Sequence, residues 1–387
     1  MPAPAIQSPP ARELVARFGS PLYVYDAGQV RAAYRAFAGA FPYAPLDLHY
    51  AIVCNKNRYL VAALAAEGAG IHANTPGDAF AALEAGVPAD RIVYSGTNLS
   101  ADDFAFLLPR GIAMNLDSLD QLRDLGGRAP VGLRLLIDEP EAANRIGVTQ
   151  AELPEALALA TITRLHMYAG TNTLSPARFL ACLDRLIAAS DLLPDLEAID
   201  LGGGFGVPYR EGLPPLDLAA LGHEVAERME ALSARRGRRI GLVVEPGRTL
   251  VAQAGTLYMT VVSVKERGGR RFVGVDSTVG NIVVPSVYHP YHRIEALEPR
   301  GGALDVPTDI CGNTTHSRDF LGRDLRLPAL QPGDLLAMHD VGAYGYAMSS
   351  HFLNRPRPAE VVLDGGNAIL TTRREGFADL LSTWEAP

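Results

Sequence analysis

Eight short apolar runs alternate with helix-like stretches between residues 46 and 250, and this rhythm constrains the fold more than any other feature. Strands that alternate with helices are typical of parallel sheets built from βαβ units, and eight of them predict a (β/α)8 barrel. Amphipathic segments fill several of the gaps, among them Pro76–Gly86, Pro176–Ala189 and Leu216–Arg235. The eight runs are Leu46–Val53, Ala69–Ala73, Arg91–Ser95, Ile112–Ser118, Val131–Ile137, Thr163–Ala169, Leu196–Leu201 and Ile240–Val244.

After Arg248 the apolar runs come closer together, without helices between them, which favours an antiparallel β domain. The early run Pro21–Tyr25 is a candidate for a further strand of this domain. We therefore predict an α/β chain with a TIM-like barrel over residues 28–265 and an antiparallel β-sandwich or barrel domain over residues 1–27 and 266–387. The later runs are Leu257–Lys265, Arg271–Ser277, Asn281–Val287, Leu335–His339 and Ala359–Leu363.

Composition excludes several classes of function. A net charge of −8 argues against a nucleic-acid partner, for which a basic patch is expected. No apolar run reaches the ~20 residues that span a bilayer, and Met1–Pro10 lacks the features of a secretory signal, so no membrane association is expected. Three cysteines form no disulfide pattern, which predicts a cytoplasmic protein.

Two glycine-containing loops follow the last two runs of the expected barrel. Gly202–Gly206 follows the seventh run, and Glu245–Arg248 follows the eighth. The loops after strands seven and eight form the usual phosphate site of such barrels, because glycines let backbone N–H groups approach an anion. One glycine run alone is more often a tight turn, but two at these places predict a phosphate pocket. Its candidate contacts are Gly202, Gly203, Gly204, Gly247 and Arg248.

Several motifs resemble the fold type III, pyridoxal-phosphate-dependent decarboxylases of the ornithine, diaminopimelate and arginine decarboxylase group. The resemblance implies a barrel plus a β domain, pyridoxal phosphate as cofactor, an amino-acid-like substrate, and a homodimer with shared active sites. The motifs are Pro21–Asp26, Tyr50–Asn57, Leu201–Gly206, Glu245–Arg248, Gly342–Gly345 and Arg355–Glu360.

The resemblance also implies roles for single residues. Glu245 would contact the ring nitrogen of the cofactor, Tyr168 would stack on its ring, and Tyr344 would reach its phosphate. Cys311 would return a proton to the substrate carbon after decarboxylation, although such a cysteine is by itself more often a small buried residue. We assign no residue to a metal.

The substrate side of the motifs departs from the diaminopimelate enzymes. Val284 and Gly312 fall where those enzymes resemble one another in carrying Arg and Glu, whereas Tyr288 is kept. We therefore expect a substrate other than diaminopimelate. The loop after Gly312 is longer than the loop that the family usually has there, and it supplies His316 and Arg318. With Tyr288, these two residues are the candidate substrate contacts.

Val53 stands at the position where the family carries the lysine that holds the cofactor as a Schiff base. Valine has no amine for this bond. The chain has only two lysines, and Lys265 ends the run Leu257–Lys265, which follows the eight barrel strands, so Lys56 is the one internal donor near the barrel mouth. A surface lysine at the start of a helix is the plainer interpretation of Lys56.

Three hypotheses follow. The chain is a decarboxylase-like enzyme that uses Lys56 or holds pyridoxal phosphate noncovalently. Alternatively, it is an inactive or regulatory homologue that lends Cys311 and Tyr344 to a lysine-bearing partner in a mixed dimer. In the third, the barrel carries a reaction other than decarboxylation.

Overall fold

The computed structural model describes residues 10–136, 145–287, 291–299, 301, 304 and 306–385. It divides into two compact units. The barrel unit comprises Arg31–Pro208 and Pro214–Leu250. The β unit comprises Met1–Val30, Tyr209–Leu213 and Val251–Pro387, so it draws on both ends of the chain.

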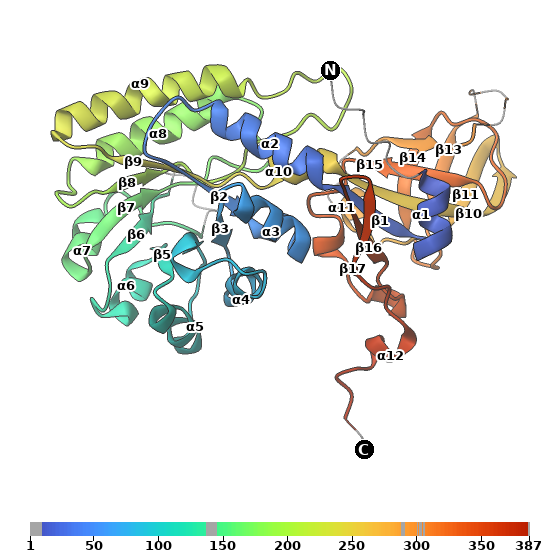
Figure 1. Ribbon diagram of the computed structural model, residues 1–387, viewed down its shortest axis with the longest axis horizontal. Helices are drawn as coiled ribbons and strands as arrows, with labels where there is room; N and C mark the ends of the chain where they lie inside the picture. Colours follow the sequence, from blue (N-terminus) through green and yellow to red (C-terminus); the bar gives the residue numbers. More distant parts are fainter. Residues whose placement is uncertain are drawn as a thin grey trace. The chain divides into compact units, whose positions relative to one another are not determined.

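The barrel unit contains the predicted closed barrel of eight parallel strands, joined in the order β2 to β9 (Figure 1). Each strand pairs with the next, and β9 closes the ring by pairing with β2, for example Leu46 with Leu242. The strands are β2 (Leu46–Ala51), β3 (Gly70–Ala73), β4 (Ile92–Tyr94), β5 (Ala113–Leu116), β6 (Val131–Arg134), β7 (Ile162–His166), β8 (Ala198–Asp200) and β9 (Gly241–Val244).

Helices surround this barrel and include the three that the sequence predicts, α4, α8 and α9. Figure 1 shows α8 and α9 side by side on the outside of the strands. The α-helices are α2 (Ala27–Gly39), α3 (Arg58–Ala66), α4 (Pro76–Glu84), α5 (Ala101–Leu107), α6 (Leu119–Leu125), α7 (Leu153–Leu159), α8 (Pro176–Ser190), α9 (Leu218–Arg236) and α10 (Arg248–Val251). Short 3-10 turns of this unit are η1 (Ile52–Cys54), η2 (Ala89–Arg91) and η3 (Leu108–Arg110), and η4 (Ala252–Ala254) follows α10 within the β unit.

Capping residues set where several of these helices begin. Thr75 accepts a hydrogen bond from the Asp78 N–H before α4, whose first residue is Pro76. Ser100 and Asp103 form a reciprocal capping box before α5. Such caps satisfy backbone N–H groups that have no partner within the helix, so the local sequence fixes these boundaries.

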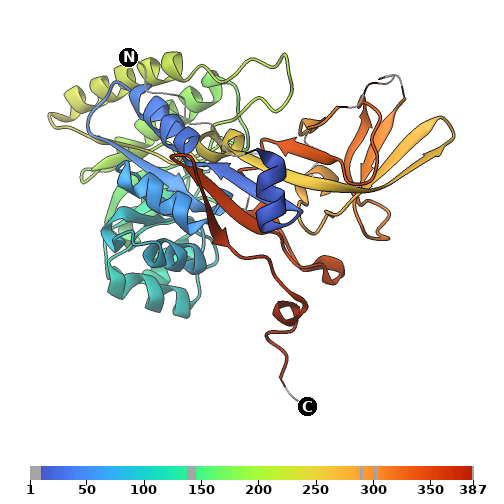
Figure 2. The same ribbon diagram turned by 45° about the vertical axis from the view of Figure 1, so that its right-hand side comes forward.

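The β unit contains a mixed, mostly antiparallel sheet with the order β14-β13-β11-β10-β1-β16-β17, in which β15 pairs with β10 and β12 (Figure 2). The predicted strand near the N-terminus is confirmed as β1, which pairs in parallel with β16. The strands are β1 (Leu22–Asp26), β10 (Gly255–Arg267), β11 (Arg270–Val275), β12 (Ile294–Ala296), β13 (Thr308–Cys311), β14 (Phe320–Leu325), β15 (Leu335–His339), β16 (Ala359–Asp364) and β17 (Asn367–Thr372).

The prediction of a strand at Asn281–Val287 is wrong, because this segment forms a turn and the short helix α11 (Val284–Val287). The Asn281 and Ile282 N–H groups bond back to the Thr278 carbonyl, at 2.9 and 3.1 Å. Pro285 has no N–H to donate to a strand ladder. The apolar composition of the run was therefore a misleading signal.

The remaining helical segments of the β unit are α1 (Ala11–Phe18), η5 (Tyr346–Met348), η6 (Phe352–Asn354) and α12 (Phe377–Leu380). One core cluster joins α1, β1 and β16 through Leu14, Leu22, Val24, Ala359 and Val361. Residues from the two ends of the chain therefore share one core. Among the described residues, no helix combines the length and the apolar character that a bilayer span requires.

Candidate functional site

The loops that follow β7, β8 and β9 contact one another at the carboxyl end of the barrel. A Cβ atom on Gly202, which has a φ of 68°, would lie 2.0 Å from the Met167 carbonyl oxygen. A Cβ on Gly203 would lie 2.7 Å from the Glu245 carbonyl oxygen, and Gly204 is equally confined. Only glycine fits these positions, so the glycine run is required by the packing of the three loops.

Glu245 is the buried acid of this site, with 2% of its surface exposed. Its Oε2 atom lies 3.3 Å from His166 Nε2 and 3.5 Å from His72 Nε2. Its Oε1 atom has no hydrogen-bond partner among the described residues. Burial lowers the pKa of each histidine to about 4, so both imidazoles are neutral at pH 7. One buried carboxylate oxygen is thus left to accept a bond from a bound group.

Asp200 holds the start of the glycine run. Its two carboxylate oxygens accept hydrogen bonds from the Gly202 N–H at 3.0 Å and from Asn115 Nδ2 at 3.1 Å. Burial, followed by the nearby charge of Glu245, raises the pKa of Asp200 to about 6. Ligand atoms of His166, Asp200 and Glu245 lie within 4.8 Å of one another, a spacing that a metal ion also tolerates. The hydrogen bonds to Asp200 account for its place without an ion.

Tyr168 lies in the loop after β7, and 36% of its surface is exposed. The Arg134 guanidinium lies 5.6 Å from the ring centroid, and the phenol oxygen is 2.9 Å from Thr171 Oγ1. Burial lowers the pKa of Arg134. The cation and the hydroxyl contact hold the Tyr168 ring in place beside the glycine run.

Val53 lies in η1, directly after β2, and 38% of its surface is exposed. This turn packs against the loop after β9. The Ala51 N–H donates to the Pro246 carbonyl at 3.1 Å, and a Cβ on Gly247 would lie 2.4 Å from Cys54 Sγ. Position 53 therefore presents an exposed apolar side chain beside the loop that carries Glu245. Arg248 begins α10 immediately after this loop.

Lys56 is exposed and lies between the buried residues Asn55 and Asn57. Asn57 accepts a hydrogen bond from the Tyr59 N–H at 3.1 Å and so caps α3. Tyr50 donates its hydroxyl to the Asn55 carbonyl at 2.8 Å. These contacts fix the turn on both sides of Lys56, whose catalytic role stays a prediction.

Cys311 and Tyr344 belong to the β unit. Cys311 ends β13, and burial together with the charges of Asp309 and Asp319 raises the pKa of its thiol to about 11. The thiol consequently keeps its proton at neutral pH. Tyr344 follows β15 and has a left-handed backbone, with a φ of 60°. Their reach into a partner's site stays a prediction.

The loop after Cys311 is anchored by the buried carboxylate of Asp319. It accepts hydrogen bonds from Thr278 Oγ1 at 2.9 Å, from the Val279 N–H at 2.7 Å and from the Thr314 N–H at 3.0 Å. A Cβ on Gly312 would lie 2.1 Å from Asp319 Oδ1. A side chain at position 312 is therefore incompatible with this loop.

The structure describes two of the three candidate substrate contacts, His316 and Arg318. The His316 ring meets Phe352 edge to face, with 5.5 Å between ring centroids. Arg318 is exposed and lies in the same loop. Tyr288 lies outside the described residues. Their contact with a substrate stays a prediction.

Comparison with known proteins assigns the family. Residues 27–252 match the model of the pyridoxal-binding domain of the pyridoxal-dependent decarboxylases. The chain belongs to this family. The residues matched include β2 to β9 and both glycine-containing loops, so the resemblance seen in the motifs is confirmed.

Similar members of the pyridoxal-dependent decarboxylases include diaminopimelate decarboxylases from two organisms. The protein of Methanothermobacter thermautotrophicus is 34% identical over 97% of this chain and 94% of its own. That of Pseudomonas fluorescens is 36% identical over 95% and 93%. The structure of diaminopimelate decarboxylase from Helicobacter pylori, complexed with L-lysine, is 28% identical, covers 96% of this chain and 98% of its own, and has a TM-score of 0.88.

These relatives correct one expectation. Val284 and Gly312 favoured a substrate other than diaminopimelate, yet the relatives that match nearly the whole chain at 30–36% identity are diaminopimelate decarboxylases. The expectation was wrong because two positions were given more weight than the similarity that extends along nearly the whole chain.

Pyridoxal phosphate is the cofactor that the pyridoxal-binding domain of this chain implies, and the residues of the site fit it. The unpartnered Oε1 of Glu245 is a buried acceptor for the N–H of a pyridinium ring. The Gly202–Gly204 run brings backbone close to the same point. Glu245 would hold the ring nitrogen, while Gly203, Gly204, Gly247 and Arg248 are placed to hold the phosphate.

Sequence reasoning missed the polar residues beneath Glu245, namely His166, Asp200 and Asn115. Each lies in or at the end of a barrel strand, and Asp200 lies two residues before Gly202, the first residue of the glycine run. A polar side chain at the carboxyl end of a barrel strand signals a functional site. That signal was present in the sequence.

Proposed function

We propose that this chain binds pyridoxal phosphate without a covalent bond to the protein and decarboxylates diaminopimelate, the substrate named for its relatives. The observation that carries the proposal is the buried, unpartnered Oε1 of Glu245 beside two glycine-lined loops. When bound, pyridoxal phosphate supplies the electron sink that permits loss of CO2.

The residues around Glu245 leave its Oε1 atom available to a ring nitrogen. His72 and His166 are neutral at pH 7, so neither brings a competing positive charge to the carboxylate. Tyr168, held against Arg134, offers an aromatic surface for a bound ring. Glu245 would thereby keep a proton on the ring nitrogen.

The protonated thiol of Cys311 is the proposed proton donor in the second half of the reaction. We place it, with Tyr344, in the site of a partner subunit, so that the active unit is a homodimer with shared sites. Cys54, Cys182 and Cys311 form no disulfide with one another, which supports a reducing, cytoplasmic setting. Cell fractionation that recovered the protein outside the cytoplasm would contradict this setting.

Val53 offers no amine, so the contacts of Glu245, the glycine run and Arg248 alone would retain the cofactor. The test uses wild-type protein and the variants Val53→Lys and Lys56→Gln. Each is loaded with pyridoxal phosphate, reduced with borohydride and mapped by mass spectrometry, and CO2 release from diaminopimelate is measured in parallel. We expect saturable cofactor binding, no labelled residue in the wild type, and a label at position 53 in Val53→Lys.

Restoring the lysine should raise CO2 release by about 100-fold, the lower range of a positioned acid–base group. Lys56→Gln should match the wild type. A label on Lys56 in the wild type would contradict noncovalent retention and support the Lys56 hypothesis instead. Cofactor binding without CO2 release, even in Val53→Lys, would contradict the proposed decarboxylation.

A further inference from the structure

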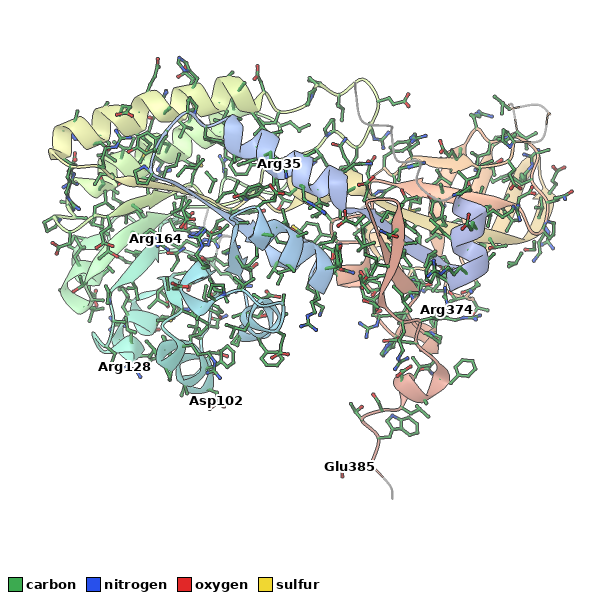
Figure 3. The ribbon with its side chains drawn as sticks, in the orientation of Figure 1. Arg35, Asp102, Arg128, Arg164, Arg374 and Glu385 are labelled. Atoms are coloured by element: carbon green, nitrogen blue, oxygen red, sulfur yellow. The ribbon has the colours of Figure 1, made fainter. Side chains whose placement is uncertain are left out.

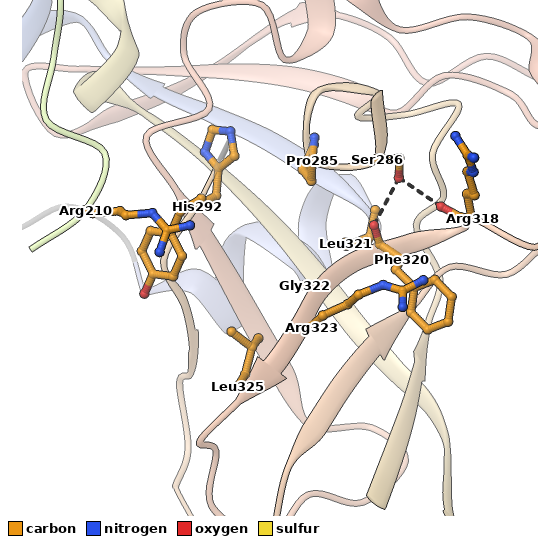
Figure 4. A pocket seen from close by; sticks show the side chains of 11 residues that line it. Arg210, Pro285, Ser286, His292, Arg318, Phe320, Leu321, Gly322, Arg323 and Leu325 are labelled. Atoms are coloured by element: carbon orange, nitrogen blue, oxygen red, sulfur yellow. Dashed lines mark hydrogen bonds between the residues drawn. The ribbon is translucent and has the colours of Figure 1, made fainter. Parts of the chain in front are cut away.

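A cavity lies wholly within the β unit, and none of the residues assigned to the cofactor lines it. Its volume is about 450 Å3 (Figure 4). The described residues that line it include three arginines, Arg210, Arg318 and Arg323, and no aspartate or glutamate. The cavity is therefore strongly positive. Its polar lining also includes Ser286, Tyr291 and His292.

None of these three arginines forms an ion pair with a described carboxylate. Other arginines of the β unit do so, such as Arg270 with Asp309 at 2.8 Å and Arg357 with Glu375 at 2.6 Å. Three guanidinium groups in one concave surface, with no counter-charge among the described residues, repel one another. An anion bound among them would remove this repulsion.

Aromatic rings hold two of the guanidinium groups in place. The Arg323 guanidinium lies 3.7 Å from the centroid of the Phe320 ring, and that of Arg210 lies 5.1 Å from the centroid of Tyr291. A guanidinium stacked on a ring keeps its N–H groups at the edge, where they can bind oxygen atoms. Less side-chain freedom is then lost when an anion binds.

The loop that carries Arg318 is also fixed. Ser286 Oγ lies 3.0 Å from both the Arg318 and the Phe320 carbonyl oxygens (Figure 4). Asp319 anchors the same loop from the other side. Figure 4 shows Arg210 on one side of the cavity and Arg318 and Arg323 on the other. This separation suits a ligand with more than one anionic group.

We propose that this cavity is a binding site for a small polyanion that carries phosphate or carboxylate groups. Arg323 and Arg210 bind its oxygen atoms from opposite sides, and Arg318 adds a third positive charge. The site is distinct from the barrel loops that hold the cofactor phosphate, and it does not require the proposed decarboxylation.

Isothermal titration calorimetry at low ionic strength tests the proposal, with pyrophosphate and citrate as the two probes. The full chain is titrated with and without saturating pyridoxal phosphate. We expect one saturable site per chain for at least one probe, unaffected by the cofactor. Tighter binding of pyrophosphate would indicate a phosphate ligand, and tighter binding of citrate a polycarboxylate.

The variants Arg323→Gln and Arg210→Gln should each weaken binding about tenfold or more, because each removes charge-assisted hydrogen bonds. Arg267→Gln is the matched control, since Arg267 is exposed in the same unit and does not line the cavity. Its affinity should stay within twofold. No saturable binding of either probe, an equal loss in Arg267→Gln, or competition by pyridoxal phosphate would overturn the proposal.

Discussion

Gly203 is the residue that brings the glycine run against the loop after β9. Because Gly203 has no side chain, its backbone can lie close to the Glu245 carbonyl. A Cβ atom on Gly203 would lie only 2.7 Å from the carbonyl oxygen. Neither atom belongs to a flexible side chain, so any larger residue must displace one of the two loops. The identity of this residue thus sets the geometry of the site.

Gly203→Ala should lower the free energy of unfolding by about 1–3 kcal/mol and weaken pyridoxal phosphate binding, because both loops must shift. Urea denaturation and an absorbance titration with the cofactor measure the two effects. Gly39→Ala is the control, since a Cβ there meets no atom within 4 Å. Equal behaviour of the two variants would contradict the proposed packing.

Glu245→Gln tests the ring contact. The amide has the shape of the carboxylate but no charge, so the protonated ring loses its ionic partner. We expect pyridoxal phosphate to bind about tenfold more weakly, with the fold unchanged by circular dichroism. Unchanged cofactor affinity would remove Glu245 from its proposed role.

Among elements, the loop from Gly312 to Asp319 is held by one buried carboxylate, that of Asp319. Asp319 ties the loop to the turn at Thr278 and Val279, and its carboxylate fills the space where a residue 312 side chain would begin. Gly312 is therefore required by this position of Asp319. The sequence showed both residues but not that one requires the other.

Asp319→Asn should lower the free energy of unfolding by about 2–3 kcal/mol, because an amide NH2 group would face donors that now bond to a carboxylate oxygen. Asp324→Asn is the matched control on β14. Its carboxylate is exposed and paired with Arg270, so its loss should cost less than about 1 kcal/mol. Urea denaturation of both variants measures the difference, and a similar cost for the two would count against the anchoring role.

Several elements followed from sequence alone because their signals are local. Alternating runs predicted the eight barrel strands, and the N-terminal run predicted β1. The strands β12, β13, β14 and β17 escaped prediction. For β12 and β13 the pairing joins segments distant in sequence, such as Ile294 with Met338 on β15 and Thr308 with Arg271 on β11. Pro285 and the turn before it were likewise hidden within an apolar run.

For the whole molecule, the buried groups of the barrel couple stability to pH. His72 and His166 have folded pKa values of about 4, below the ordinary value of 6.5. In the window between these values the unfolded chain binds protons that the folded chain does not, so stability falls as pH drops from 6.5 towards 4. Asp200 opposes this trend, because its folded pKa of about 6 exceeds the ordinary 3.8.

His72→Asn should reduce the acid-induced loss of stability between pH 6.5 and 4.5 by about 2 kcal/mol, since one of the two histidines no longer titrates. Urea denaturation at four pH values across this window measures the slope. His223→Asn is the control, because His223 is exposed on α9. Identical slopes for wild type and His72→Asn would contradict the assignment.

The proposed shared sites give a prediction for the assembled molecule. Glu245→Gln and Cys311→Ala should each be inactive or nearly so, yet a refolded equal mixture should recover about a quarter of the wild-type CO2 release. Half of the dimers would then be mixed, and each would contain one intact site. A monomeric chain in light scattering, or a mixture as inactive as its components, would contradict shared sites.

The sequence by itself determined the barrel, most of the β domain, the cofactor loops and the absence of a lysine at position 53. These features depend on local periodicity, turn residues and motif spacing. Only the tertiary structure brought His72, His166 and Asp200 around Glu245, left one of its oxygens unpartnered, and gathered Arg210, Arg318 and Arg323 about one cavity. Such contacts join residues far apart in the chain, so burial and charge compensation are decided by folding and not by neighbours in sequence.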